Sequence, residues 1–354
     1  YGFRLTDDPG PSADVLPADA RRMRVALLVP LSGASAQTGQ AIANAATMAL
    51  LDTKADDLRI TQYDTASGPG AAANRALADG ARLILGPLSP EDVRVVSAAA
   101  QARQVPVLSY ANDERVAGGG TFVMGSLPAQ SIARTVAHAR GQGIERFAAL
   151  LPAGDYGQRS GAALQASVRA AGGSVGHMET YNASTGSLGA AARRLALKGG
   201  YQAVLIADSG RTGSQAAPLL RTGGAAPRIL GTELWSGDNA APAASALRGA
   251  WFSAVSDGRF RQFAESYRAR FGAAPPRIAT LGYDSVLLAV RMAREWKPGT
   301  ALPPSRLVQR DAFVGVDGAF RFAASGVIER AFEVREVRAG SVAVISPAPE
   351  AFAP

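Results

Sequence analysis

The sequence predicts an α/β protein with two lobes, each built around a parallel β-sheet. Short apolar runs alternate with segments of helical periodicity, a pattern typical of βαβ units with right-handed crossovers. The alternation stops after residue 109 and restarts near residue 131, so the chain contains two such series. Its 354 residues are enough for two domains of roughly 150 residues each.

The first series begins with residues 24–30, a continuous apolar run typical of a strand that is buried on both faces. Apolar positions with helical spacing follow, and Thr38 is the predicted N-cap of this first helix. The remaining elements of the first lobe alternate strand and helix, at residues 58–64, 71–78, 82–86, 91–103 and 105–109.

The second series starts with a helix and repeats the alternation. We expect its helices at residues 131–141, 157–171, 188–197 and 215–221. We expect its strands at residues 146–151, 174–181, 202–208, 228–231 and 250–255. Two helices then follow without an intervening strand, and the tail changes to antiparallel strands with Gly-containing turns. These last elements are predicted at residues 260–271, 278–296, 313–322 and 329–337.

The chain has no cysteine and only two histidines, His138 and His177, which lie far apart in the sequence. Disulfides, thiol nucleophiles and thiolate zinc sites are therefore excluded, and we expect neither a metal nor a cofactor. The net charge of +8 comes almost entirely from arginines. Either a GC-rich genome or an anionic partner explains this charge. Because the arginines are scattered singly, without interleaved aromatics, we expect no nucleic-acid partner.

Enzyme motifs are absent from the sequence. It contains no P-loop, no dinucleotide-binding fingerprint and no nucleophile elbow, so we expect a protein that is not an enzyme. No run approaches the ~18 apolar residues of a membrane helix, and no signal peptide is present. The chain is therefore either cytosolic or a trimmed form without its leader, and a start at Tyr1 rather than Met favours the second interpretation.

Polar loops follow the predicted strands. Ligands of open parallel sheets bind at the carboxyl ends of strands, and loops with hydroxyl, amide and acidic groups suit a small polar ligand. These loops contain the candidate ligand residues Ser32, Asn112, Ser209 and Trp235. An ordinary turn role for such residues remains the alternative. We expect Trp251 inside the core and Trp235 at the rim of a cleft.

The loop after the first strand carries a family resemblance. Residues 25–33, with Thr38-Gly-Gln40 opening the next helix, resemble type I periplasmic binding proteins of the leucine/isoleucine/valine branch, the substrate-binding proteins of ABC transporters. The resemblance covers about residues 23–346 and continues at residues 84–89, 105–109, 155–157 and 283–284.

This resemblance implies two Rossmann-like lobes with parallel sheets, interleaved by three crossovers, and a periplasmic location. It implies a ligand in the cleft between the lobes and a hinge motion that closes them. The implied division gives residues 23–128 and 257–308 to the first lobe and residues 129–256 and 309–346 to the second. A flexible arm at residues 1–22 and a tail at residues 347–354 complete the chain.

The resemblance also implies which residues lie at the cleft, namely Leu88, Ser89, Ala111, Tyr156 and Glu233. Glu233 would suit a ligand ammonium. Two positions depart from the pattern of amino-acid-binding relatives, because Pro90 stands where a second Ser is usual and Asp113 where a Thr is usual. Proline has no amide proton to donate. The Asp113 carboxylate repels a ligand carboxylate unless it is protonated or paired.

A second resemblance lies within the same fold. Residues 109–113, 124–128, 230–235 and 315–322 resemble penicillin-binding protein activators, envelope lipoproteins that dock on a peptidoglycan synthase and stimulate it. Two functions therefore stay open. The first is a receptor that holds a small polar, amino-acid-like ligand for uptake or sensing, with an ABC permease as partner. The second is an activator with a penicillin-binding protein as partner and a lipid anchor upstream of Tyr1.

Overall fold

The computed structural model describes residues 19–222, 224 and 226–352, so the predicted arm lies almost wholly outside the described residues. The chain forms two compact units. Unit 1 contains the chain through Ala111, residues 116–123 and Ile278–Val308, and unit 2 contains residues 112–115, 124–277 and the chain from Gln309. The expected boundaries differ from this division at three places, because residues 112–115, 124–128 and 257–277 belong to unit 2.

Unit 1 is built on a five-stranded parallel sheet with the order β2-β1-β3-β4-β5. Its strands are β1 (Met23–Val29), β2 (Leu58–Asp64), β3 (Leu83–Leu85), β4 (Val107–Ser109) and β5 (Thr121–Val123). The first four match the predicted strands. The three-residue strand β5 was not predicted, because a run this short carries no periodicity.

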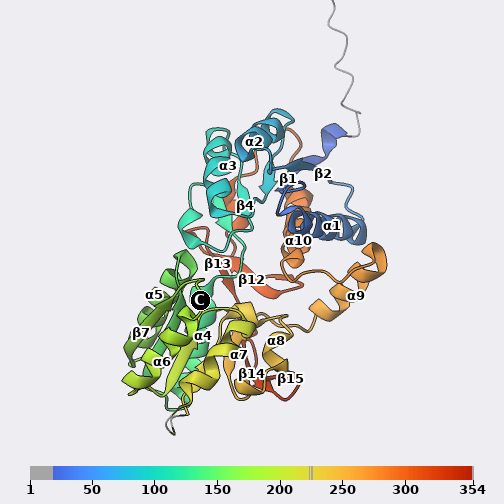
Figure 1. Cartoon of the computed structure of the whole chain (residues 1–354). Coiled ribbons are helices and arrows are strands. Elements are labelled where there is room, and N and C mark those ends of the chain that lie inside the picture. Colours follow the sequence, from blue (N-terminus) through green and yellow to red (C-terminus); the bar gives the residue numbers. More distant parts are fainter. Residues whose placement is uncertain (1–18, 223, 225, 353–354) are drawn as a thin grey trace, which may run out of the picture. The chain divides into compact units, whose positions relative to one another are not determined.

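Four helices cover this sheet, and they pack in two pairs (Figure 1). They are α1 (Ala36–Thr53), α2 (Pro69–Ala78), α3 (Pro90–Ala102) and α10 (Ala279–Glu295). Helix α1 packs on α10, and α2 packs on α3. Because the strand order reverses at β1, right-handed crossovers place the two pairs on opposite faces. Helix α1 has Ser35 at its N-cap position, so the prediction of Thr38 was wrong by one turn.

Unit 2 is built on a seven-stranded mixed sheet with the order β15-β14-β10-β9-β8-β6-β7. Five strands are parallel, namely β6 (Arg146–Pro152), β7 (Ser174–Tyr181), β8 (Ala203–Ile206), β9 (Arg228–Leu230) and β10 (Trp251–Ala254). Strands β14 (Glu333–Arg338) and β15 (Ser341–Ser346) add antiparallel at one edge. A separate antiparallel sheet joins β11 (Phe313–Gly315), β12 (Gly318–Phe322) and β13 (Ile328–Arg330). The sequence did not predict β15.

Helices enclose two hydrophobic cores against the faces of the large sheet. Helices α4 (Pro128–Gly141) and α5 (Asp155–Ala170) pack together over one core. Helices α6 (Ser187–Lys198), α7 (Gly210–Leu220) and α8 (Ala240–Ala243) enclose the other. Helix α9 (Phe260–Phe271) has the predicted bounds. None of the helices in the described part of the chain has both the length and the hydropathy to cross a bilayer.

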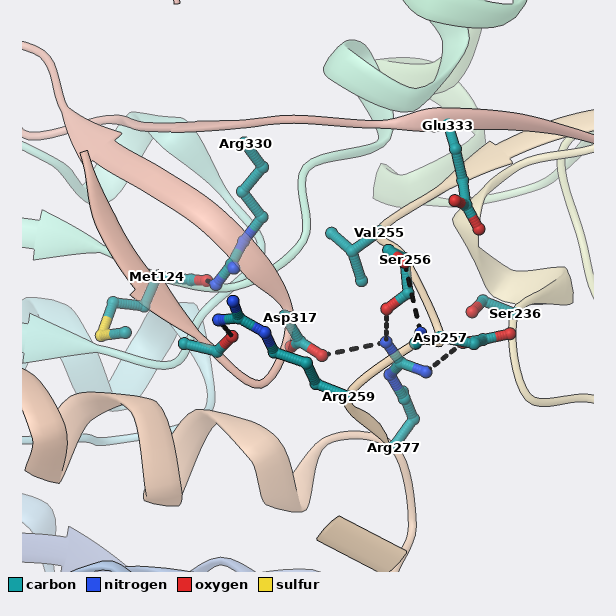
Figure 2. Close-up of polar contacts among 12 residues, drawn as sticks. Met124, Ser236, Val255, Ser256, Asp257, Arg259, Arg277, Asp317, Arg330 and Glu333 are labelled. Carbon is teal, nitrogen blue, oxygen red and sulfur yellow. Dashed lines mark hydrogen bonds and ion pairs between the residues drawn. The ribbon is translucent and has the colours of Figure 1, made fainter. Parts of the chain in front are cut away.

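A cluster of arginine contacts in unit 2 holds two of the residues at which the chain enters or leaves this unit, Met124 and Arg277 (Figure 2). Arg277, the last residue before unit 1 resumes, pairs with Asp257 and, at 3.0 Å, with Asp317. Arg330 donates to the carbonyl oxygen of Met124 at 2.6 Å. Charge-assisted bonds of this kind are stronger than neutral ones, so they fix these segments on unit 2.

Candidate functional site

The predicted ligand residues divide between the two units. Unit 1 holds Ser32, Leu88, Ser89 and Ala111, and unit 2 holds Asn112, Asp113, Tyr156, Ser209, Glu233 and Trp235. Every one of them follows a strand of its sheet, either in a loop or at the start of the next helical element.

In unit 1, two serine hydroxyls organise the loops in which they lie. Ser32 donates to Oδ2 of Asp64 at 2.5 Å, and the same carboxylate accepts from the backbone N–H of Leu31 at 2.8 Å. These bonds lower the pKa of Asp64, with the Ser32 hydroxyl as the largest cause. Ser89 caps α3 by accepting from the backbone N–H of Asp92 at 3.2 Å.

As the N-cap of α3, Ser89 still has a hydroxyl hydrogen that it can donate. Its oxygen accepts from the helix, so its own hydrogen can still be donated. Pro90 follows as the first residue of α3 and has no N–H, as the sequence indicated. Ala111 is buried and Leu88 is half-buried, so they can offer backbone groups and apolar surface.

In unit 2, three side chains form a hydrogen-bonded series that ends on a buried carboxylate. Thr232 Oγ1 lies 2.9 Å from the hydroxyl of Tyr156, near the start of α5. Tyr156 donates to Oε1 of Glu233 at 3.1 Å, which commits its only proton and leaves Thr232 as the donor in the first bond. Glu233 opens the 3₁₀ turn Glu233–Trp235 after β9, which brings it beside α5.

The second oxygen of Glu233 is an unsatisfied acceptor. Oε2 is buried, and within the part of the chain that the structure describes it has no hydrogen-bond partner. Burial raises the pKa of Glu233 to about 7, against the opposing effects of the Tyr156 hydrogen bond and the Arg159 charge. Burial also raises the pKa of Tyr156, so that hydroxyl stays protonated. Buried acceptors are almost always paired, so Oε2 has an acceptor position that a donor can fill.

Asp113 forms an ion pair, which is one of the two conditions under which its carboxylate would not repel a ligand carboxylate. Its carboxylate is 1% exposed and accepts from Nε and Nη2 of Arg115, at 2.8 and 2.7 Å. This bidentate contact is the largest reason why the pKa of Asp113 falls to about 2. The charge that would repel a ligand carboxylate is therefore balanced locally.

The same network fixes residues 112–115 to α5. Arg115 Nη2 contacts Oδ1 of Asp155 at 2.6 Å, and Arg159 contacts the other oxygen of Asp155 at 2.8 Å. Arg159 also donates to the carbonyl oxygen of Asn112 at 2.7 Å. The helix that carries Tyr156 is thus held in place by alternating charges.

Two other predicted residues have structural roles. Ser209 caps α7 by accepting from the backbone N–H of Thr212 at 3.2 Å. The prediction that Trp235 lies at a rim is wrong, because it is 1% exposed and belongs to the core between the sheet and α7. Its ring packs over Gly231, and its indole N–H donates to the carbonyl oxygen of Asp208 at 2.8 Å. Trp251 lies in the core as predicted.

The sequence did not indicate three residues that shape this region, Thr232, Arg115 and Arg159. Arg159 follows Asp155 by one helical turn, and this i,i+4 spacing of opposite charges was a usable signal. No local pattern revealed that Thr232 would meet Tyr156, because the two residues are 76 positions apart.

Among residues 19–222, 224 and 226–352, no group of three or more acidic or histidine side chains could hold a metal ion. His138, on α4, packs edge-on against the Trp251 ring with centroids 4.9 Å apart, and burial lowers its pKa. His138 therefore has a packing role in the core of unit 2.

Comparisons with known proteins agree with this architecture. The model of a family described as "Periplasmic binding protein" matches residues 22–340. Among curated proteins, an uncharacterized protein of Rickettsia prowazekii is 25% identical over 180 residues, which are 50% of this chain and 48% of the relative. The match thus spans about half the length of that relative.

Solved structures with this fold cover nearly the whole chain. A Rhodospirillum rubrum protein described as a branched-chain amino acid ABC transporter has a TM-score of 0.78 at 21% identity, over 92% of this chain and 100% of its own. LivJ of Streptococcus pneumoniae in complex with isoleucine has a TM-score of 0.67 at 20% identity, over 93% and 100%. Full-length LpoA of Haemophilus influenzae has a TM-score of 0.68 at 17% identity, over 92% and 59%. At these identities the likeness concerns the fold alone.

Proposed function

This chain belongs to the periplasmic binding protein family, and from that premise we propose that it is a non-enzymatic binding protein of the periplasm or cell envelope. It holds a small polar, amino-acid-like ligand for uptake or sensing. The ligand's ammonium group binds to Glu233. Among the other predicted ligand residues of unit 2, Tyr156 supports this contact through its hydrogen bond to Oε1.

The observation that carries this proposal is the unsatisfied oxygen of Glu233. A buried carboxylate without a second partner costs free energy, and an ammonium supplies both the opposite charge and a hydrogen bond. The series from Thr232 through Tyr156 fixes Oε1, so Oε2 is left for the ligand.

The experiment is a thermal-shift screen of amino acids and small amines, followed by calorimetric titration of the best compound. A true ligand present at about 100 times its Kd adds about 2.7 kcal/mol to stability, which raises Tm by several degrees. Glu233→Gln should abolish the shift, and Tyr156→Phe should weaken it.

The matched control is Glu179→Gln, the same substitution on β7, where Glu179 pairs with Arg194 and Lys198. This variant should keep the full shift. A flat response of the wild-type chain to every compound would contradict the proposal. So would a Glu233→Gln variant that responds like the wild type.

The second candidate is an activator of a peptidoglycan synthase, and the loops of unit 1 favour it. Pro90 offers no N–H, and Ser32 donates its only hydroxyl proton to Asp64. Few donors are therefore free for a ligand carboxylate. The test adds purified protein to a penicillin-binding protein of the same organism and measures transglycosylase and transpeptidase rates. A rise that Glu233→Gln does not affect would favour this function over ligand binding.

A further inference from the structure

The outer strands of the two sheets are protected unequally. In unit 1, β2 presents Arg59 and other exposed polar residues, and β5 has only three residues. In unit 2, β7 has a register shift, and Glu179 on it pairs with Arg194 and Lys198 of α6. Charges, irregularities and short length are the usual means by which proteins prevent edge strands from pairing.

Strand β15 has only one of these protections, a register shift against β14 that lies between Val344 and Ser346 and so outside residues 342–344. It forms the other outer edge of the seven-stranded sheet (Figure 1). Its sequence Ser-Val-Ala-Val-Ile-Ser contains neither a charge nor a proline, and Val344 is 51% exposed. The chain after β15 turns away, because Arg134 of α4 donates to Ser346 Oγ at 2.7 Å and to the carbonyl oxygen of Pro347 at 3.2 Å. The edge is therefore open in the described residues.

The ladder shows which backbone groups face outward. Val337 donates to the carbonyl oxygen of Ala250 and accepts from the N–H of Gly249, so its backbone faces β10. Val342 lies opposite Val337, and Val344 lies opposite Arg335. Arg335 is two residues from Val337, so its backbone groups point in the same direction as those of Val337. Because backbone groups alternate along a strand, the N–H and C=O of Val342 and Val344 point away from β14, toward the open edge.

We propose that β15 is a homodimer seam, at which two copies of this chain pair antiparallel about a two-fold axis at Ala343. In this register Val342 of each copy lies opposite Val344 of the other. The two outward-facing residues of each strand then meet as hydrogen-bonded pairs, with four N–H···O=C bonds in total. The exposed Val344 side chains gain a cross-strand valine neighbour.

A second copy fits this edge because the strand is complementary to itself. Pairing brings no like charges together, since the strand has none. The spacing of two residues between the outward-facing groups satisfies all of them in a symmetric pair, and two-fold symmetry is the commonest arrangement of oligomers. Because six-residue strands bury less surface than a standard interface, we expect self-association in the micromolar range.

The first test is sedimentation of the full chain over a series of concentrations. The wild type should approach a dimer as the concentration rises to about 0.1 mM. Val344→Pro should remain a monomer, because it removes an outward N–H without removing a bond to β14. Val344→Lys should also remain a monomer, and it keeps the backbone intact if proline disturbs the strand. Val344→Thr, which is β-branched and keeps the N–H, should dimerise like the wild type.

The second test examines the register by cross-linking. Since the chain has no cysteine, a single introduced thiol is unique. Ala343→Cys lies on the axis, where facing Cα atoms are about 4.5 Å apart, a distance that a disulfide can span. The control Ser341→Cys places the two thiols about 13 Å apart along the strands, so it should not cross-link.

Three results would overturn the proposal. One is a monomer at every concentration, in which case the edge serves another segment or none. Another is a dimer that survives both Val344→Pro and Val344→Lys. The last is cross-linking of Ser341→Cys as fast as Ala343→Cys. Far-UV circular dichroism and Tm of each variant show whether the fold is kept.

Discussion

The proton of Glu233 is coupled to both folding and ligand binding. Its pKa is about 7 in the folded chain, against an ordinary value of 4.5. Because the folded value is higher, the stability associated with the protonated group is fully present below pH 4.5 and is lost as the pH rises toward 7. A shift of this size corresponds to roughly 3 kcal/mol above pH 7.

Urea unfolding of wild type and Glu233→Gln at pH 5 and pH 8 tests this coupling. At pH 8 the variant should be more stable than the wild type by up to roughly 3 kcal/mol, because an amide avoids the buried charge. At pH 5 the difference should shrink to about 1 kcal/mol or less. Glu179→Gln is the control of opposite sign, since hydrogen bonds from Lys198 and Arg194 lower the pKa of Glu179. Equal differences at the two pH values would contradict the coupling.

Ligand binding should follow the opposite trend. A ligand ammonium needs the ionised carboxylate, so its affinity should increase as the pH rises through about 7, the pKa of Glu233. Calorimetric titration at pH 6 and pH 8 measures this change, and Glu233→Gln should show none. An affinity that is independent of pH in the wild type would argue against a cationic group at Glu233.

Arg115 balances a buried charge although its own side chain is 54% exposed. Arg115→Gln leaves the Asp113 carboxylate without its bidentate donor, so we expect a loss of about 1–3 kcal/mol in the free energy of unfolding at pH 7. Arg115→Lys should recover only part of this loss, because an ammonium does not form the two parallel bonds.

A double-mutant cycle with Asp113→Asn checks the assignment. If Arg115 acts on Asp113, the two substitutions should not be additive. The low pKa of Asp113, about 2 against 3.8, adds stability above pH 3.8 that is lost as the pH falls toward 2. Arg115→Gln should therefore weaken the dependence of stability on acid pH. Additive effects would show that Arg115 acts through other contacts.

At the scale of elements, each unit has a glycine where a helix closely approaches the end of the strand that precedes it. In unit 1, a Cβ on Gly39 of α1 would lie 1.7 Å from the carbonyl oxygen of Pro30. In unit 2, a Cβ on Gly157 of α5 would lie 1.8 Å from the carbonyl oxygen of Pro152. Glycine lets each helix approach the end of its strand, and this approach positions the loop that carries candidate ligand residues.

Alanine in place of either glycine should therefore lower the stability of the fold. Gly39→Ala and Gly157→Ala force the helix away from the strand, and we expect each to lower the free energy of unfolding by about 3 kcal/mol or more. The control is Gly141→Ala in the last turn of α4, where a Cβ meets nothing within 4 Å. That substitution should be neutral or stabilising, since alanine favours helix. Similar losses at all three positions would show that the close approach is not the cause.

The sequence predicted those parts of the fold that depend on local periodicity. Helix α9 has its predicted bounds, because its apolar spacing and the following glycine are local signals. Strand β15 was missed, because a six-residue run near the end of the chain resembles a loop as much as an edge strand. The position of Trp235 was also missed, because its burial depends on Gly231 and on α7, which no local pattern relates to it.

For the candidate site, the sequence predicted residues but not the contacts between them. Tyr156 and Glu233 were both expected, but not the bond between them or the acceptor left on Oε2, since both depend on the pairing of distant segments. Asp113 was recognised as an unfavourable charge, and the structure supplies its partner two residues away. Residue types indicate which chemistry a site can carry, whereas the packing of distant segments determines which side chains form hydrogen bonds with one another.

At the scale of the whole molecule, each unit is assembled from separated stretches of chain. Unit 1 is incomplete without residues 278–308, which contain α10. Helix α10 packs against α1, and Ser285 on it lies 2.8 Å from the buried hydroxyl of Tyr110. Tyr283, also on α10, donates to Asp52 at 2.9 Å. A chain cut after residue 123 therefore loses a core face of unit 1 together with a partner for a buried polar group.

A fragment of residues 19–123 should accordingly lack a cooperative unfolding transition. Its α1 would expose the surface that α10 covers, and the Tyr110 hydroxyl would be buried without Ser285 or would force the strand end open. Joining residues 278–308 to this fragment through a flexible Gly/Ser linker should restore a sigmoidal transition in urea. Far-UV circular dichroism measures this transition. If the fragment alone unfolds cooperatively at the midpoint of the joined one, the interleaved chain is not what stabilises unit 1.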